Sequence, residues 1–323
     1  MTTIANSDLD VFPLCLGGSV FGWTADEQTS FRILDNYVDV GGNFIDTADA
    51  YSQWAPGNTG GTSESIIGRW LTSRKIRDRV VIATKVGRKH DLSGLSAKTI
   101  STAVEGSLRR LRTDRIDLYY AHADDPGTDL EETLTAFDAL IAAGKVRHIA
   151  ASNISGPRLA EALDLSRRAG LARYVAVQPP YNLVEREPFE SELGPLCERE
   201  QISCVPYFAL AQGFLTGKYR HDAPPVQSVR SVAATPHGAT PGGRAVLQAL
   251  DTVAAERGVA PAAVALAWLA AQPHIVAPLA SSRTTEQLAE LIPGATLRLS
   301  ASEVQLLTIA SSTAATDTYT HID

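Results

Sequence analysis

The chain of 323 residues has little sulfur. Its cysteines are Cys15, Cys197 and Cys204, an odd number without CxxC spacing, and it has a single methionine. A disulfide framework or a cysteine-based zinc site is therefore not expected, and the thiols should be reduced. The first residues show neither a basic start nor an apolar run, so we expect no signal peptide and a cytoplasmic location.

The sequence also lacks an excess of positive charge and a long apolar run. Lys and Arg number 29 against 36 Asp and Glu, a formal net charge of −7. Nucleic-acid binding needs a basic face, so we expect no nucleic-acid partner. The longest apolar stretch, residues 260–271, is interrupted by Pro261 and is too short to span a bilayer, so no membrane association is expected. Hydrophobic residues make up 44% of the chain, enough for a large buried core.

Short apolar runs alternate with longer segments of helical period along the whole chain. The runs are 14–17, 43–46, 80–85, 116–122, 146–152, 174–179, 202–207 and 275–281. Most are apolar throughout, which is typical of parallel strands buried on both faces. Between them, Ile100, Val104, Leu108 and Leu111 recur at the spacing of an amphipathic helix. Alternating strands and helices predict right-handed βαβ units and a parallel sheet.

Eight such units in this length favour closure of the sheet. We therefore predict an α/β fold, a (β/α)₈ TIM barrel, as a single domain over residues 1–323 with a C-terminal helix and tail after about residue 293. The connection after the seventh strand, about 211–243, is rich in Pro, Gly, Ser and Thr and shows no periodicity. It is expected to form a long loop over the C-terminal mouth, where barrels carry active sites.

Polar residues stand at or just after the ends of three early strands. Asp46 ends NFID, Lys85 ends VVIATK, His122 ends IDLYYAH, and Tyr51 follows Asp46 by five residues. In a parallel barrel these strand ends converge on one mouth. A lysine that ends an apolar strand needs a counter-charge, which Asp46 on the preceding strand can supply.

These residue types fit the reduction of a carbonyl group. Tyr51 can donate a proton to the carbonyl oxygen, and the ammonium of Lys85 is expected to lower the tyrosine pKa toward neutral pH. Asp46 would keep Lys85 charged. His122 can hydrogen-bond the same oxygen and orient the substrate.

Each residue alone also has an ordinary structural interpretation. Asp46 can form a turn, Tyr51 can be a packing residue, and Lys85 can extend along the strand end toward water. His122 with Asp124 and Asp125 could form a metal cluster, but HxDD lacks further ligands and we expect no metal. For the same reason a metal-dependent TIM-barrel hydrolase is disfavoured. All four ordinary interpretations together would require four coincidences.

The stretches GGNFIDTADAYS, VVIATKVG and IDLYYAHADDP resemble the motifs of the aldo-keto reductase superfamily. The similarity extends from about Leu14 to Leu291. It implies a barrel oxidoreductase that reduces an aldehyde or ketone, or oxidises the corresponding alcohol or sugar, with Asp46, Tyr51, Lys85 and His122 as the catalytic tetrad. It leaves open a second function, an NADPH-binding regulatory subunit with slow turnover. The oligomeric state is not predicted.

No GxGxxG follows a strand, so a Rossmann-type cofactor site is not expected. The resemblance instead implies that NADP(H) lies across the barrel mouth. Its implied contacts are Ser152, Asn153 and Gln178 to the carboxamide, Tyr207 on the nicotinamide ring, and Phe208, Leu210, Gln212, Gly213 and Lys218 around the pyrophosphate. At the adenosine end they are Ser281, Arg283 to the 2′-phosphate and Gln287 to the adenine side.

Two positions depart from the superfamily pattern. Ser281 stands where glycine is common, and Leu291 stands where an asparagine commonly contacts adenine, so NADH is a possible cofactor as well. Trp23 and Trp54 are expected to line a substrate pocket for a small-molecule carbonyl or alcohol. The sequence does not identify that substrate.

Overall fold

The structure, a computed structural model, describes residues 1–220 and 228–312. Eight parallel strands form its centre: β3 (Cys15–Gly17), β4 (Phe44–Asp46), β5 (Val81–Val86), β8 (Ile116–Ala121), β9 (Val146–Ser152), β10 (Tyr174–Gln178), β11 (Ser203–Cys204) and β12 (Leu279–Ala280). They pair in chain order, β12 pairs with β3, and a parallel bridge from Cys204 to Ile275 joins the two ends of the sheet. The strands therefore close into a barrel, and the predicted (β/α)₈ fold is confirmed.

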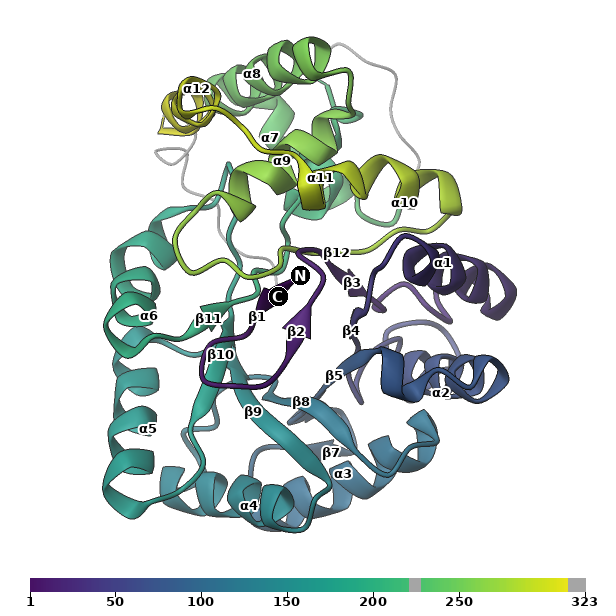
Figure 1. Cartoon of the computed structure of the whole chain (residues 1–323), viewed down its shortest axis with the longest axis vertical. Coiled ribbons are helices and arrows are strands. Elements are labelled where there is room, and N and C mark those ends of the chain that lie inside the picture. The colour runs from purple at the N-terminus through teal and green to yellow at the C-terminus, as the bar shows by residue number, and fades with distance from the viewer. Residues whose placement is uncertain (221–227, 313–323) are drawn as a thin grey trace.

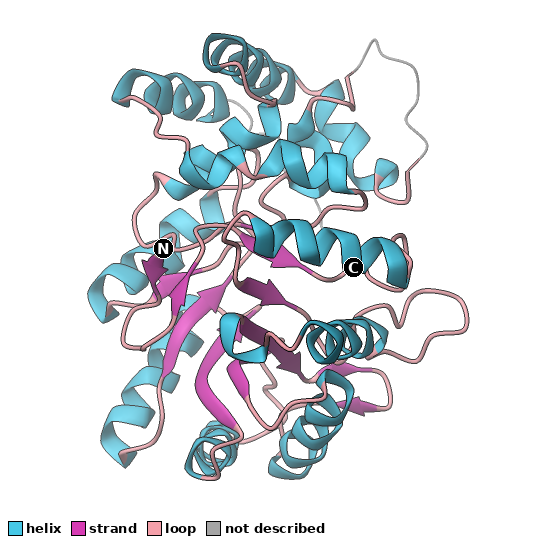
Figure 2. Ribbon diagram, turned by 45° about the vertical axis from the view of Figure 1, so that its right-hand side comes forward, coloured by secondary structure: helices cyan, strands magenta, loops and turns pink. Residues whose placement is uncertain are grey.

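Helices surround the strands, and several more gather beyond one edge of the barrel (Figures 1 and 2). Those between β3 and β11 are α1 (Glu27–Asp39), α2 (Thr62–Arg74), η1 (Arg77–Arg79), α3 (Ala97–Leu111), α4 (Leu130–Ala142), α5 (Gly156–Ala169), η2 (Phe189–Leu193) and α6 (Gly194–Glu200). The later ones are η3 (Ala211–Thr216), α7 (Ser231–Ala239), α8 (Pro241–Arg257), α9 (Pro261–Ala270), α10 (Thr285–Leu291), α11 (Pro293–Thr296) and α12 (Ala301–Ser312). Local sequence sets several helix starts: the side chains of Asp26 and Ser96 accept hydrogen bonds from backbone N–H groups of α1 and α3.

Successive side chains of each strand point alternately into the barrel and toward the surrounding helices, so the protein has two buried apolar layers. In β5, Val81 and Ala83 point into the barrel, while Ile82 and Val86 pack against the helices. Lys85 has the same parity as Val81 and Ala83, so its side chain also enters the barrel interior. A charged group is thereby placed at the top of an otherwise apolar core.

A short hairpin closes the end of the barrel at which the strands begin. Its strands, β1 (Thr2–Thr3) and β2 (Asp10–Val11), cross the barrel in Figure 1, and Ile4, Leu9 and Val11 join the interior core. The barrel is therefore open for ligands at the C-terminal ends of its strands. Two-residue strands carry too little periodicity for the sequence to have predicted this hairpin.

The segment 211–243 is more ordered than predicted. Its described part contains η3, α7 and the start of α8, while residues 221–227 lie outside the described residues. Phe214, Leu215 and Ala234 are buried, and this burial favours helices that the local Pro and Gly content obscured. Beyond residue 293 the chain forms α11 and α12, and the predicted tail at 313–323 lies outside the described residues.

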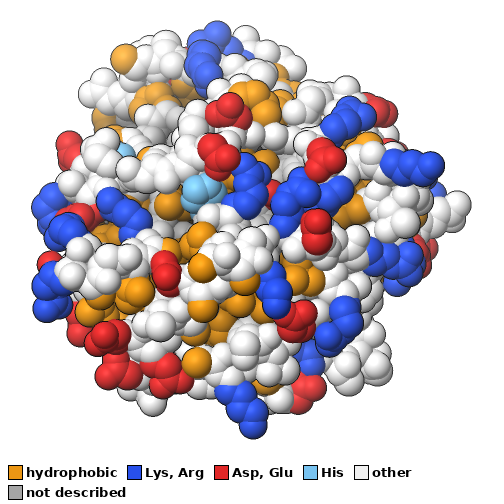
Figure 3. All heavy atoms as spheres, turned by 60° about the horizontal axis from the view of Figure 1, so that its bottom comes forward, with side chains coloured by type: hydrophobic (Ala, Val, Ile, Leu, Met, Phe, Trp, Pro, Cys, Tyr) orange, Lys and Arg blue, Asp and Glu red, His pale blue; other side chains and the backbone are white. Residues whose placement is uncertain are grey.

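Within the described residues, no single helix has both the length and the hydropathy to cross a membrane, and α8 and α9 meet these criteria only together, across a bend of 98°. Figure 3 shows one face of the molecule, on which basic and acidic side chains lie interspersed.

Candidate active site

A cavity of about 1210 Å³ lies at the C-terminal mouth of the barrel. Tyr51, His122, Trp23 and Trp54 line one part of it, and the tetrad residues Asp46 and Lys85 lie buried beneath. This location follows from the fold, because β4, β5 and β8 end side by side and each delivers one polar residue to the same point.

The structure brings Asp46, Tyr51 and Lys85 into direct contact. The Lys85 Nζ donates to Asp46 Oδ1 at 2.5 Å, to the Thr47 carbonyl at 2.9 Å and to the Tyr51 hydroxyl at 2.8 Å. The Tyr51 hydroxyl donates in turn to Asp46 Oδ1 at 3.1 Å. Lys85 is 1% exposed and Asp46 0%, so each charge depends on the other for its stability.

The pKa of Tyr51 differs from the sequence-based expectation. Burial, and next to it the Asp46 carboxylate, raises the pKa of the Tyr51 phenol well above its ordinary value. Lys85 was expected to lower that pKa, but Asp46 contacts both groups and offsets the ammonium charge at the tyrosine. Tyr51 therefore keeps its proton throughout the neutral pH range, which is the form a proton donor requires.

His122 lies beside Tyr51, with ring centroids 6.0 Å apart in an edge-to-face arrangement. Burial, followed by the positive charges of Lys85 and Arg88, lowers the pKa of the imidazole well below its ordinary value. His122 is therefore neutral at physiological pH. Its Nδ1 is buried and has no hydrogen-bond partner within residues 1–220 and 228–312, which leaves Nε2 for a ligand in the cavity.

The three residues expected to bind a carboxamide form a network beside the tetrad. Gln178 Nε2 donates to Asp46 Oδ2 at 3.0 Å, and the Ser152 hydroxyl donates to the Gln178 carbonyl at 2.8 Å. Asn153 Nδ2 donates to the His122 carbonyl at 2.7 Å, and Asn153 Oδ1 accepts from the Tyr207 hydroxyl at 2.8 Å. The predicted carboxamide contacts and the tetrad thus share one hydrogen-bonded unit.

The backbone after β11 is strained where a pyrophosphate loop was predicted. Phe208, Ala211 and Gln212 adopt positive φ values of 53°, 46° and 56°, followed by Gly213 at 100°. Left-handed residues next to right-handed ones turn successive N–H groups toward a common point and form anion-binding nests, and such strain is typical of ligand clamps. Lys218 Nζ lies 5.1 Å from the Tyr219 ring centroid and also lines the cavity.

The adenosine end of the predicted site follows β12, which lies beside the β11 segment in the barrel. The Arg283 backbone N–H donates to Gln287 Oε1 at 2.9 Å, which fixes the start of α10 against the preceding loop. All the predicted cofactor residues line this one cavity: Ser152, Asn153, Gln178, Tyr207, Phe208, Leu210, Gln212, Gly213, Lys218, Ser281, Arg283 and Gln287. The volume of the cavity, the strained loop and the cations Lys218 and Arg283 together fit a dinucleotide that carries a pyrophosphate and a separate phosphate group.

The two tryptophans expected in the substrate pocket form one aromatic wall. Trp23 and Trp54 pack edge to face with centroids 5.6 Å apart, and Trp54 lies 6.0 Å from the Tyr51 ring. Among the cavity residues that sequence reasoning missed are two cations, Arg88 and Arg230. The position of Arg88, three residues after the predicted catalytic lysine, was a signal that could have identified it.

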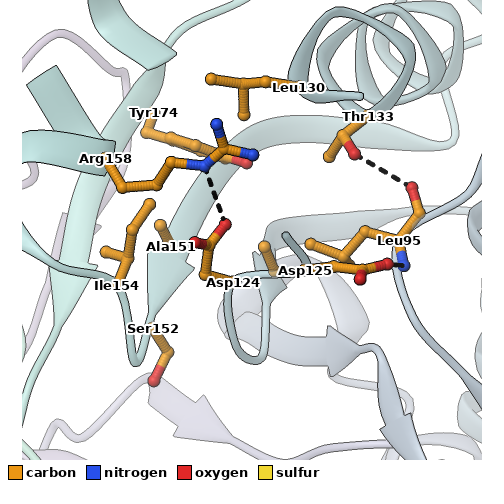
Figure 4. Close-up of a pocket in the computed structure, with 11 residues that line it drawn as sticks. Leu95, Asp124, Asp125, Leu130, Thr133, Ala151, Ser152, Ile154, Arg158 and Tyr174 are labelled. Carbon is orange, nitrogen blue, oxygen red and sulfur yellow. Dashed lines mark hydrogen bonds and ion pairs between the residues drawn. The ribbon is translucent and has the colours of Figure 1, made fainter. Parts of the chain in front are cut away.

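A second hollow, shown in Figure 4, lies outside the barrel beside Asp124 and Arg158. Its volume of about 10 Å³ is at most that of one water molecule. Asp124 accepts from Arg158 Nε at 3.2 Å, whereas Asp125 Oδ2 accepts from the Leu95 N–H at 2.7 Å. These carboxylates therefore serve structural contacts, and no group of three or more candidate metal ligands occurs among the described residues.

The fold is thus a (β/α)₈ barrel with Asp46, Tyr51, Lys85 and His122 at its mouth, and comparison with known proteins gives the family. The aldo/keto reductase family model matches residues 13–311, so the chain belongs to the aldo/keto reductase family. Members of this family are oxidoreductases that generally use NAD(P)H. This chain is accordingly an oxidoreductase, and carbonyl reduction is the general reaction that its membership supports.

Several curated relatives match over most of the chain. It is 35% identical to the uncharacterized oxidoreductase YrpG of Bacillus subtilis, covering 95% of this chain and 94% of the relative. It is 34% identical to the norsolorinic acid reductase stcV of Emericella nidulans, over 91% and 76%. It is 30% identical to the aryl-alcohol dehydrogenase [NADP(+)] of Phanerodontia chrysosporium, over 93% and 82%.

Proposed function

We propose that this protein is an NADP(H)-dependent reductase of aromatic aldehydes or ketones with Tyr51 as the general acid. The observation that carries the proposal is the contact of the Tyr51 hydroxyl with Lys85 Nζ at 2.8 Å, on the floor of the cavity and beside His122. A protonated phenol, a buried ammonium and a neutral imidazole at one point suit the protonation of a carbonyl oxygen.

Each tetrad residue has one task in this reaction. Tyr51 gives its proton to the carbonyl oxygen as negative charge develops there, and Lys85 stabilises the phenolate that remains. Asp46 holds the ammonium charged and in position. His122 donates a hydrogen bond from Nε2 to the same oxygen, so the carbonyl is aligned before the proton moves.

The cofactor supplies the hydride when it is bound. Ser152, Asn153 and Gln178 would hold its carboxamide, and Tyr207 would set the face of the ring. The strained backbone at 208–213 with Lys218 suits the pyrophosphate, and Arg283 suits a 2′-phosphate through a charge-assisted contact. The name of the Phanerodontia relative includes NADP(+), which favours NADP(H) over NADH here.

The aromatic wall supports an aromatic substrate. Trp23 and Trp54 lie next to Tyr51, and flat rings pack well against such side chains. Two relatives bear names that specify aryl-alcohol or norsolorinic acid as substrates. We therefore infer a small-molecule aryl carbonyl compound, with no nucleic-acid or membrane partner needed for the reaction.

The test is a spectrophotometric assay with NADPH, NADH and a panel of aromatic and aliphatic carbonyl compounds. Tyr51→Phe should lower kcat by about 10²- to 10⁴-fold, the usual contribution of general acid catalysis, while NADPH binding persists. Tyr119→Phe is the matched control, because this buried hydroxyl packs outside the barrel interior and has no hydrogen-bond partner in the described part of the chain. Equal activity of Tyr51→Phe and wild type would refute the mechanism. Tight NADPH binding without turnover of any substrate would favour a regulatory subunit.

A further inference from the structure

The cavity carries positive charges that no carboxylate of the described residues pairs with. Its lining contains four cationic side chains, Arg88, Lys218, Arg230 and Arg283, and one carboxylate, Glu290. Elsewhere arginines commonly pair with acids, as Arg158 does with Asp124 and Glu161. Within the described ranges 1–220 and 228–312, none of the four cavity cations has a carboxylate within 4.0 Å. A ligand with several negative charges is therefore expected.

The proposed cofactor does not account for all four cations. Lys218 and Arg283 lie beside the residues assigned to its phosphates, and Arg230 lies over the Trp23 ring at 5.4 Å. Arg230 also interacts electrostatically with Tyr51, but its guanidinium is engaged by the Trp23 ring. Arg88 follows the end of β5 and has no such ring contact among the described residues, and its charge contributes to lowering the pKa of His122. It therefore lies at the catalytic end of the cavity, where no phosphate of the cofactor is assigned.

The backbone of Arg88 is held firmly at that position. Gly87 turns the chain away from β5 with a φ of +114°, a conformation that other residues rarely adopt. Arg88 then starts the small hairpin β6 (Arg88–Lys89) and β7 (Leu92–Ser93). Gln53 Nε2 donates to the Arg88 carbonyl at 3.1 Å, which ties the hairpin to the loop that carries Tyr51.

The Arg88 guanidinium, at the catalytic end of the cavity, is suited to bind an anionic group such as a carboxylate. Arginine stays charged at any physiological pH and can bind a carboxylate through two parallel hydrogen bonds. Because Arg88 has no acidic partner among the described residues, an incoming anion would not have to displace an existing ion pair. The aromatic wall of Trp23 and Trp54 lies in the same cavity and can hold a ring that joins the anion to the carbonyl.

We propose that the preferred substrate is an aromatic carbonyl compound with a separate anionic group, a carboxylate or a phenolate, which binds to Arg88. This inference rests on the proposed reductase function and adds a substrate class to it. Arg88 acts as a specificity residue. It does not take part in proton transfer, and any effect of its charge on His122 is common to charged and neutral substrates, so that effect cancels in the ratio of the two.

The experiment compares substrates that differ in charge alone. Reduction of 3- and 4-carboxybenzaldehyde is measured beside that of their methyl esters, which keep the ring and the aldehyde. In wild-type protein the acid should be favoured in kcat/KM for at least one isomer. In Arg88→Gln the acid-to-ester ratio of kcat/KM for that isomer should fall about tenfold or more, mainly through the KM of the acid.

Lys89→Gln is the control for a general charge effect. It removes one positive charge from the neighbouring position, but Lys89 pairs with Asp91 and does not line the cavity. The acid-to-ester ratio of Lys89→Gln should equal that of wild type. An unchanged ratio in Arg88→Gln for both isomers, or an equal fall for acid and ester, overturns the inference while the reductase function stands. Failure of wild type to reduce any carbonyl compound overturns both.

Discussion

At the scale of single residues, Asp49 is a buried carboxyl group next to the site. It is 1% exposed, and within the described residues neither side-chain oxygen has a hydrogen-bond partner. Burial, and then the charge of Glu64, raises the pKa of Asp49 to about 7 from 3.8, against smaller opposing effects of Arg110 and Lys89. The folded protein therefore binds this proton more tightly than the unfolded chain does.

The consequence is a pH dependence of stability with a defined sign. The proton on Asp49 stabilises the fold fully below about pH 4, and this stabilisation is lost as the pH rises through 7. Asp49→Asn mimics the protonated form, so it should be more stable than wild type at pH 8, by on the order of 2–4 kcal/mol, with little difference at pH 4. The free energy of unfolding in urea, determined between pH 4 and 8, measures this difference.

Asp251→Asn is the control, because it breaks a surface ion pair with Arg220 and should show no such pH-dependent gain in stability. Parallel curves of unfolding free energy against pH for Asp49→Asn and wild type would contradict the assignment.

The tetrad was predictable from sequence because strand ends of a parallel barrel converge wherever they lie in the chain. The same rule located Lys85 beside Asp46 without any contact information. This rule could not give the pKa of Tyr51. That pKa depends on the burial of the phenol and on how far Asp46 offsets the Lys85 ammonium, and both follow only from the folded structure. The rule also passed over Arg88, whose exposure to the cavity depends on the turn at Gly87.

At the scale of elements, the packing of α2 against α3 depends on Gly68. A Cβ at this position would lie 2.1 Å from the Arg110 carbonyl oxygen and 2.7 Å from the Leu111 carbonyl carbon, both of them backbone atoms. Relief would need α2 to move away from α3, which would also strain the 2.6 Å ion pair of Arg110 with Glu64.

Gly68→Ala should therefore destabilise the protein by about 1–3 kcal/mol, although alanine favours an isolated helix. Gly106→Ala in α3 is the matched control, since its Cβ would meet only the flexible end of the Arg110 side chain, at 3.0 Å. That variant should be as stable as wild type or more so. Free energies of unfolding in urea measure both, and equal values for the two variants would show that the helices can adjust.

Element prediction succeeded where periodicity was long and failed where elements were short. The apolar spacing of Ile100, Val104 and Leu108 corresponds to buried positions of α3. The hairpin β1–β2 has only two residues in each strand, and its role depends on burying Ile4 and Val11 against strands distant in sequence. Segment 211–243 was predicted to be irregular because it is rich in Pro, Gly, Ser and Thr and has no periodicity, but tertiary burial stabilises α7 and η3 there.

At the scale of the whole molecule, the charge of the cavity opposes that of the chain. The formal net charge is −7, yet the cavity lining has four cations and one carboxylate. The low-dielectric walls of a cleft focus this local positive field, so an anionic cofactor is attracted in spite of the overall negative charge. The strength of that attraction should depend on salt, because exposed charges are screened over a Debye length of about 10 Å at 0.1 M.

Arg283 connects this field to the choice of cofactor. It lines the cavity next to Gln287, and its guanidinium has no carboxylate partner in the described part of the chain. NADPH and NADH differ only in the 2′-phosphate, so a residue that binds this group should discriminate between them. Arg283→Ala should weaken NADPH binding by about tenfold or more and NADH binding by less than twofold.

The measurement is the Kd of each cofactor, by titration of the protein fluorescence, at 50 and 300 mM NaCl. In wild type the NADPH Kd should rise more steeply with salt than the NADH Kd, because the phosphate adds charge at a cationic site. Arg283→Ala should abolish most of that difference in salt dependence.

Arg298→Ala is the control. It removes an exposed arginine that does not line the cavity, so it should leave both dissociation constants and their salt dependence unchanged. If Arg283→Ala weakened NADPH and NADH equally, the 2′-phosphate would have to be bound elsewhere. Lys218 would then be the remaining cationic candidate in the cavity lining, because Arg88 and Arg230 lie at the catalytic end.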